Sequence, residues 1–339
     1  MAQKIAQVLP LSIVAADITS KAILNQARKL DQCIIKYEAA EEIARSIVDL
    51  KNKFVLEVNP GFGVLTRALL NAGATRIFAL EPRPIFSKPL EELSKESGDR
   101  LNIIKADFKL IDRSRPGSIS SADILGRVER RLWEDEVSGY ITGVSSYLST
   151  KQLLSYLMDQ RATYRPLYHC WGRVAMAMIF PDTQSKSILA SPGSKRYGRL
   201  SLFAQMMCDV IPSVKVPVEH IYPDCQELNR RTLSTNGSAS AYPRYFQLIR
   251  LIPKREIVIT EKGTAIADEL IQQIMTVRNK PIVSILTLFL PDAIGFLEEI
   301  GVPADTTGSN LTAHDAAKII NRVAIGRQDA NGSSRSSDS

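Results

Sequence analysis

Apolar residues follow two alternating patterns through the first third of the chain. Between residues 38 and 50 they recur at three- and four-residue intervals, which predicts a helix. The short apolar run 54–56 is typical of a buried strand, and residues 64–72 again have a helical composition. Residues 76–80 and 101–104 predict a second and a third strand. Strands that alternate with helices in this way predict a parallel, doubly wound α/β sheet of the Rossmann-like class.

The second half of the chain predicts more strands and then a small C-terminal helical domain. Apolar runs at 174–180, 210–218 and 245–252 are expected to extend the sheet. After Ile259 the pattern is helical to about Val323, and Thr312 with Asp315 three residues later predicts a capped helix start. We therefore expect an α/β domain, a helical domain and a disordered polar tail at 31–255, 256–325 and 326–339.

The charge balance favours a polyanionic partner without proving one. Lys and Arg number 43 against 36 Asp and Glu, a formal net charge of +7 with a pI near 9.2. The excess is concentrated between Asp182 and Glu256, where eleven basic residues face six acidic ones. This stretch is the candidate footprint for nucleic acid.

Other features of the sequence narrow the class of protein. The first thirty residues hold four basic residues against Asp17 alone, a pattern shared by mitochondrial presequences and ordinary N-terminal helices. The four cysteines form no Cys-x-x-Cys, so neither a disulfide framework nor a metal site is expected. The most apolar segment, 281–297, is interrupted by Pro291 and Asp292 and is too short to span a bilayer.

A glycine-rich turn lies between the first predicted strand and the following helix. It contains Glu57, Asn59, Gly61 and Gly63, and its glycines allow a ligand to approach the backbone and the free N–H groups of the helix. Glu81 follows the second strand, where a doubly wound fold places a carboxylate on ribose hydroxyls. The sequence therefore predicts a nucleoside-binding crevice at this edge of the sheet.

The third strand ends at another carboxylate, Asp107, followed by the aromatic residue Phe108. A dinucleotide fold would carry a third glycine where this chain has Thr66, so a dinucleotide-dependent oxidoreductase is disfavoured. The acidic Glu57 would repel a phosphate and suits the cationic methionine portion of S-adenosylmethionine. That cofactor is the one we expect.

With these residues in place, the chain resembles the rRNA adenine N6,N6-dimethyltransferase family, in particular its mitochondrial branch. The turn is similar to the family's E-x-G-P-G-x-G-x-L-T except for Asn59, which tolerates left-handed backbone angles better than most residues. Residues 30–32, which include Gln32, are similar to the start of an L-S-Q-N-F-L motif, although Cys33 replaces its Asn. Residues 133–135 resemble a Trp-Glu-Asp of the mitochondrial branch, and 194–201 resemble the motif S-K-x-Y-G-R-L-S.

The resemblance weakens at the catalytic loop. The family carries Asn-Leu-Pro-Tyr or Asn-Leu-Pro-Phe, and this chain has Val144, Ser145, Ser146 and Tyr147 at those positions. In the family, the Asn side chain and the Pro carbonyl accept hydrogen bonds from the adenine N6 amine, and the aromatic ring stacks on the flipped-out base. Val144 has no acceptor, whereas the Ser146 carbonyl could accept one bond and Tyr147 could stack.

The resemblance implies a Rossmann-like methyltransferase that dimethylates adjacent adenines at N6 in mitochondrial small-subunit rRNA, in the mitochondrial matrix. The lost Asn favours the alternative, an impaired homologue that acts as a mitochondrial transcription factor B or an rRNA-binding assembly factor. In that case mitochondrial DNA and the mitochondrial RNA polymerase are candidate partners. The expected nucleic-acid contacts are basic residues of the 194–201 segment and of the helical domain: Lys195, Arg196, Arg199, Arg278 and Lys280.

Overall fold

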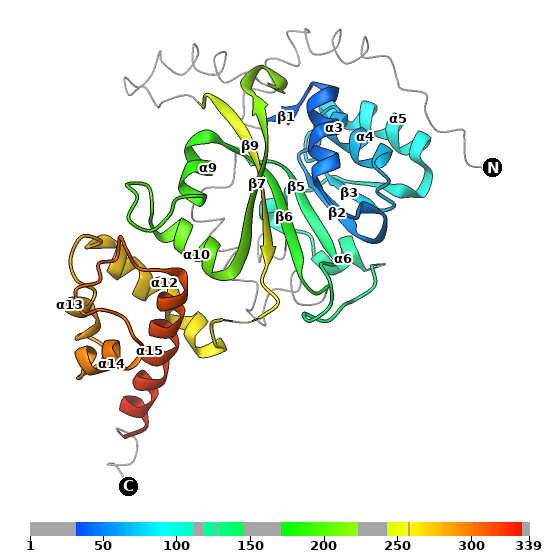
Figure 1. Ribbon diagram of the computed structural model, residues 1–339. Helices are drawn as coiled ribbons and strands as arrows, with labels where there is room; N and C mark the ends of the chain where they lie inside the picture. The colour runs from blue at the N-terminus through cyan, green and yellow to red at the C-terminus, as the bar shows by residue number, and fades with distance from the viewer. Residues whose placement is uncertain are drawn as a thin grey trace.

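The computed structural model describes residues 32–111, 118–126, 128–145, 171–222, 243–256 and 258–333, and every structural statement below concerns these residues (Figure 1). For Lys109 and residues 327–333 the structure describes the backbone alone. The N-terminal segment 1–31, with its candidate presequence, lies outside the described residues. So do Ser146 and Tyr147 of the expected catalytic loop.

A seven-stranded sheet forms the centre of the α/β part, in the order β4-β3-β2-β5-β6-β9-β7. Its strands in chain order are β2 (Phe54–Val58), β3 (Ile77–Leu80), β4 (Leu101–Ile104), β5 (Gly139–Val144), β6 (Val174–Pro181), β7 (Cys208–Pro217) and β9 (Tyr245–Pro253). A separate short pair joins β1 (Cys33–Ile34) to β8 (Ile221–Tyr222). All six sheet strands predicted from apolar runs are present, and β5 is an addition to them.

The sheet is mixed rather than wholly parallel. The pairs from β4 to β6 are parallel, but β9 pairs antiparallel with both β6 and β7. The expectation of a parallel sheet is therefore wrong for β9. The apolar runs of β7 and β9 resemble those of buried parallel strands, and apolar periodicity carries no signal of direction.

Helices cover both faces of the sheet, and alternate residues of each strand belong to one of two cores. Phe54, Leu56 and Val58 of β2 lie in one core and Val55 lies in the other. The face of Val55 is covered by the β1–β8 pair and by α3 (Tyr37–Ser46), α4 (Val64–Asn71) and α5 (Ser87–Ser97) (Figure 1). The opposite face packs against α6 (Ser121–Leu125), α9 (Asp182–Ile188) and α10 (Arg199–Met207).

The helical part follows β9. It shares with the sheet the core that contains Phe54, Leu56 and Val58. It consists of α12 (Glu261–Thr276), α13 (Val283–Leu286), α14 (Ala293–Glu299) and α15 (Ala313–Ser333) (Figure 1). The predicted cap of the last helix is confirmed, since the Thr312 hydroxyl accepts from the Asp315 amide at 3.1 Å and donates to its carboxylate at 2.7 Å. Within the described residues no helix is long and apolar enough to cross a membrane.

Helix α15 continues into the segment that was expected to be disordered. It ends at Ser333, so residues 326–333 are helical, while 334–339 lie outside the described residues. Once a helix is nucleated, each added residue gains a backbone hydrogen bond. A capped helix can therefore extend beyond its last buried turn even where the sequence offers little to bury.

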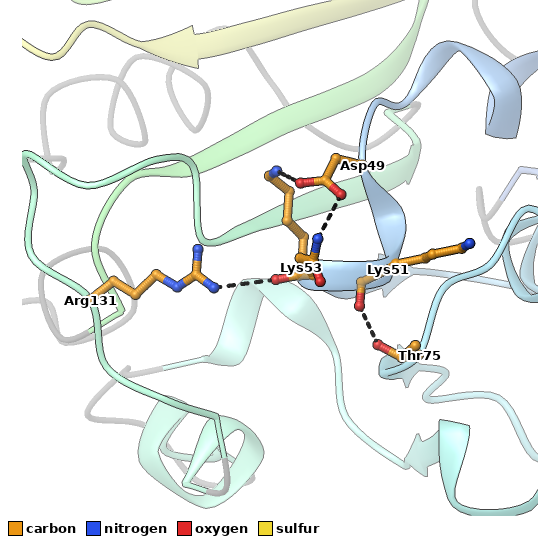
Figure 2. Close-up of polar contacts among 6 residues, drawn as sticks. Asp49, Lys51, Lys53, Thr75 and Arg131 are labelled. Carbon is orange, nitrogen blue, oxygen red and sulfur yellow. Dashed lines mark hydrogen bonds and ion pairs between the residues drawn. The ribbon is translucent and has the colours of Figure 1, made fainter.

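Beside the amino end of β2 lies a cluster of polar contacts (Figure 2). The Lys53 ammonium, only 8% exposed, lies 2.6 Å from one Asp49 carboxylate oxygen, and the Asn52 amide donates to the other at 3.0 Å. α3 ends at Ser46 because the next residue, Ile47, has an extended backbone, and Asp49, with a left-handed φ of 60°, begins the short 3₁₀ turn Leu50–Asn52. Lys53 lowers the pKa of Asp49 through its hydrogen bond and its charge. Arg131 and Thr75 donate to backbone carbonyls of the same turn.

Candidate cofactor and nucleic-acid site

The carboxyl ends of β2, β3, β4 and β5 meet at one edge of the sheet. The Asn59 amide donates to the Leu80 carbonyl and the Glu81 amide to the Ile104 carbonyl, each at 3.0 Å. Val58 pairs with Gly143 on the other side. The strand ends that carry the turn, Glu81 and Asp107 therefore follow one another in the sheet, as predicted, and β5 adds the motif position Val144 on the other side of β2.

The glycine-rich turn has the backbone conformation that its sequence demands. Asn59, Gly61 and Gly63 have φ values of 53°, 59° and 76°. Asn59 therefore adopts a left-handed backbone angle, which asparagine tolerates better than most residues. A side chain at Gly61 would lie 2.5 Å from the Cys33 sulfur. The space in front of this glycine is therefore filled by β1.

Glu57 is a buried carboxylate at the carboxyl end of β2. It is 1% exposed, and neither oxygen has a hydrogen-bond partner among the described residues. Burial raises the pKa of Glu57 to about 8. The nearby Thr66 hydroxyl, which does not reach hydrogen-bond geometry, offsets part of this rise, and the negative charge of Glu81 adds to it.

Glu81 is equally buried, at 3% exposure, but its carboxylate is saturated with donors. One oxygen accepts from the Arg83 amide at 3.0 Å and from Arg83 Nε at 2.6 Å. The other accepts from Arg83 Nη2 at 2.8 Å and from the Gly61 amide at 3.0 Å. A carboxylate has about four acceptor positions, so these contacts use all of them.

Two residues of this site were not predicted to belong to it. Arg83 binds Glu81 and stacks over the Phe86 ring at 4.4 Å from the ring centroid. Cys33 lies against Gly61, and burial raises the pKa of its thiol to about 12. The sequence signal for Arg83 was available in Glu81-Pro82-Arg83-Pro84, where two prolines fix the direction of an arginine beside the candidate carboxylate.

The remaining expected cofactor residues lie near this edge without a described contact to Glu57. Gln32 precedes β1 and is buried, at 5% exposure. Asp107 and Phe108 follow β4, which places them beyond Glu81 in the strand order, and both are half-buried. The Phe108 ring packs against the core on the opposite face of the sheet from Val55. Their role in binding stays a prediction.

Val144 ends β5 and is a core residue, 2% exposed. Its register partner is Ile179, and it packs in the core that also contains Phe62 of the glycine-rich turn. The next residue, Ser145, is 1% exposed, and its hydroxyl has no partner among the described residues. The motif position thus offers an apolar side chain where the family offers an amide.

The segment 194–201 forms a junction between the sheet and the helical part. Tyr197 is fully buried, and its hydroxyl donates to the Leu311 carbonyl at 2.7 Å. The Arg199 guanidinium pairs with Asp268 of α12. Arg278 donates to the carbonyls of Ser194 and Lys195 at 3.1 and 3.2 Å.

These contacts divide the predicted nucleic-acid residues into two groups. Arg199 and Arg278 hold the junction together, so part of their donor capacity is used within the chain. Lys195, Arg196 and Lys280 are exposed. Only the second group presents its charge fully to solvent.

The strand order and the glycine-rich turn define the Rossmann-like class of methyltransferases. A dimethyladenosine transferase structure from Plasmodium falciparum has a TM-score of 0.61 at 14% identity and covers 87% of this chain and 98% of that one. The 23S rRNA methyltransferase ErmE has a TM-score of 0.56 at 15% identity, with 86% and 99% coverage. At such identities these likenesses show the fold alone.

Sequence comparison gives the family. A profile described as ribosomal RNA adenine dimethylase matches residues 23–324, so the chain belongs to that family. The mitochondrial dimethyladenosine transferase 1 of Bos taurus is 30% identical over 206 residues, which cover 59% of this chain and 57% of the relative. The mitochondrial dimethyladenosine transferase 2 of Mus musculus is 25% identical over 303 residues, covering 84% and 75%. The match therefore spans little more than half of the bovine protein.

The family uses S-adenosylmethionine, and the residues present do not fit that cofactor as they lie. Glu57 would suit a cationic group, because a buried carboxyl without a partner gains most from an opposite charge. However, Glu81 has no open acceptor for ribose hydroxyls, and the Cys33 side chain covers Gly61. Glu57 therefore suits the cationic part of the cofactor better than Glu81 suits its ribose.

Proposed function

We propose that this chain is a mitochondrial nucleic-acid-binding member of the adenine dimethylase family in which methyl transfer is impaired. The proposed ligand is small-subunit rRNA. The observation that carries the proposal is Val144, an apolar core residue at the strand end where the family places the Asn that orients adenine. Misplacing a reacting group by about 1 Å costs roughly 100-fold in rate.

The family supports the proposed ligand and the proposed location, and the charge of the chain supports the ligand. Ribosomal RNA is the substrate class that the family is named for, and both mitochondrial relatives carry dimethyladenosine transferase names. The net charge of +7 favours a polyanion. Exposed Lys195, Arg196 and Lys280 supply positive charge on the surface around the junction. Because both relatives are named as mitochondrial proteins, we propose the mitochondrial matrix as the location of the chain.

Adenine N6 dimethylation by this chain is the second candidate, and Glu57 favours it. A fully buried carboxyl that finds no partner in the fold is costly unless a ligand supplies one. Its position at the glycine-rich turn suits a cationic ligand. An active enzyme therefore requires that the crevice open at Glu81 and that Tyr147 and the Ser146 carbonyl orient the base without an Asn.

Methyl transfer to a hairpin separates the two candidates. We expect the unaltered chain to bind a small-subunit rRNA hairpin with adjacent adenines and to transfer little label from S-adenosylmethionine. Val144→Asn restores the amide and should increase transfer, whereas Val144→Ala lacks an acceptor and should not, although it disturbs the same core. Rapid transfer by the unaltered chain would overturn the proposal, and so would the absence of hairpin binding.

The salt dependence of hairpin binding tests the two groups of basic residues. The affinity for RNA falls as salt rises, and each phosphate contact that is lost makes the plot of log K against log salt less steep by roughly one. Lys195→Ala and Arg196→Ala should make this plot less steep. Arg199→Ala should instead reduce the thermal stability of the chain, because it removes a junction ion pair, and should change the slope less.

A further inference from the structure

We propose that Arg83 occupies the ribose-binding carboxylate Glu81 and thereby sets a low affinity of this chain for adenosine-containing cofactors. This inference deepens the proposed function and rests on it for the identity of the crevice. It concerns a residue that the sequence motifs do not include. The residues that support this inference lie at the end of β3 and in the short 3₁₀ turn Pro84–Phe86.

The donors of Arg83 take the acceptor positions that a ribose needs. Three of the four donors to Glu81 come from Arg83: its amide, Nε and Nη2. The fourth is the Gly61 amide. A ribose hydroxyl could bind Glu81 only by displacing a guanidinium that is charged at every physiological pH.

Arg83 is held in this position before any ligand arrives. Pro82 and Pro84 flank it, which fixes the neighbouring φ angles and disfavours a helical conformation at Arg83 itself. Its backbone is extended, with φ of −96° and ψ of 122°. The guanidinium binds Glu81 through Nε and Nη2 and lies over the Phe86 ring. That ring is 1% exposed and packs edge-on against Phe62 at 4.8 Å between centroids.

Burial makes this competition effective. The side chains of Arg83 and Glu81 are 16% and 1% exposed, so water screens their ion pair little. Bidentate arginine–carboxylate pairs are among the stronger hydrogen-bonded contacts in proteins. A ligand therefore spends part of its binding energy on displacing Arg83.

Calorimetric titration of the full chain with S-adenosylmethionine tests this role. Arg83→Met removes the guanidinium and keeps an apolar chain over Phe86, and it should bind the cofactor about tenfold more tightly, the gain expected from one charge-assisted hydrogen bond. Arg83→Lys keeps the charge beside Glu81 but offers a compact donor, so it should show a smaller gain and guards against misfolding of the first variant. Arg67→Met, which breaks the peripheral Arg67–Glu96 pair, should leave the affinity unchanged.

A pair of simpler ligands locates the effect at the ribose. The tighter binding by Arg83→Met should be present for adenosine and absent for 2′,3′-dideoxyadenosine, which lacks the 2′ and 3′ hydroxyls of the ribose. If folded Arg83→Met and Arg83→Lys bind the cofactor no more tightly than the unaltered chain, or if dideoxyadenosine gains equally, the role of Arg83 is wrong. That result leaves hairpin binding and methyl transfer untouched, whereas rapid methylation by the unaltered chain would sink the proposed function whatever the titration shows.

Discussion

The two ends of strand β2 differ in whether their buried ionisable side chain has a partner. At the amino end, Lys53 is 8% exposed and pairs with Asp49 (Figure 2). At the carboxyl end, four residues further on, Glu57 is 1% exposed and has no partner among the described residues. A lysine paired with a carboxylate keeps its charge, whereas a buried carboxyl without a partner holds its proton unless a ligand or a reaction supplies an opposite charge. This contrast supports the proposal that the carboxyl end of β2 belongs to the functional site.

Replacing Glu57 by a neutral residue should remove the difference between the two ends of β2, and we expect it to change the stability of the chain most. Folding raises the pKa of Glu57 from 4.5 to about 8, so the folded chain holds the proton more tightly and loses stability as the pH rises from 4.5 to 8. At pH 9, Glu57→Gln should be more stable than the unaltered chain by about 4 kcal/mol. At pH 4 the two should agree within about 1 kcal/mol. Urea unfolding at both pH values measures this, and equal stabilities at pH 9 would contradict the account.

Crowding of the strand ends at this edge gives the next largest effect. A side chain at Gly143, whose φ is 137°, would lie 2.3 Å from the Val58 carbonyl oxygen. Gly143→Ala should therefore lower the free energy of unfolding by more than about 3 kcal/mol. Gly98 also has a positive φ, of 62°, but nothing lies within 4 Å of its added side chain. Gly98 has φ of 62° and ψ of −142°, so Gly98→Ala should cost about 1–3 kcal/mol from backbone strain alone. Gly143→Ala adds a clash and should cost more, and similar losses for the two variants in chemical unfolding would refute the close approach.

We expect the smallest change in stability at the amino end of β2, where the dependence on pH is opposite to that of Glu57. Lys53 lowers the pKa of Asp49, so the pair stabilises the fold at pH values above 3.8 and loses that contribution as the pH falls through the lowered pKa. Asp49→Asn should be less stable than the unaltered chain at pH 7 and indistinguishable from it at pH 2. Thermal melts at both pH values provide the measurement. A destabilisation that persists unchanged at pH 2 would show that the ion pair is not its cause.

Local signals were sufficient to predict most of the sheet and one edge of the site. The strands β2, β3 and β4 are short and apolar and alternate with helices, and Thr312 caps α15 as its spacing predicts. The left-handed angle of Asn59 follows from its place in the turn. Each of these features depends on neighbours within a few residues. The direction of β9 depends on long-range pairing, which apolar spacing does not encode.

The site required contacts that join distant segments. Cys33 reaches Gly61 through the β1–β8 pair, whose strands are far apart in the chain. The 194–201 segment was predicted from its charges as a nucleic-acid surface, but Tyr197 and Arg199 face the helical part instead. A charged residue in a sequence motif can serve packing or binding, and only its partners in the fold distinguish the two.

The central claim is that this fold is kept for binding nucleic acid while its methyl-transfer site is impaired. The most direct test is a single-turnover assay of the unaltered chain in excess over a small-subunit rRNA hairpin, at saturating S-adenosylmethionine, with bound hairpin and methylated adenine measured in the same samples. The account predicts fully bound hairpin in which N6,N6-dimethyladenosine forms slowly and reaches little of the hairpin. Rapid dimethylation of both adjacent adenines in the bound hairpin would contradict it.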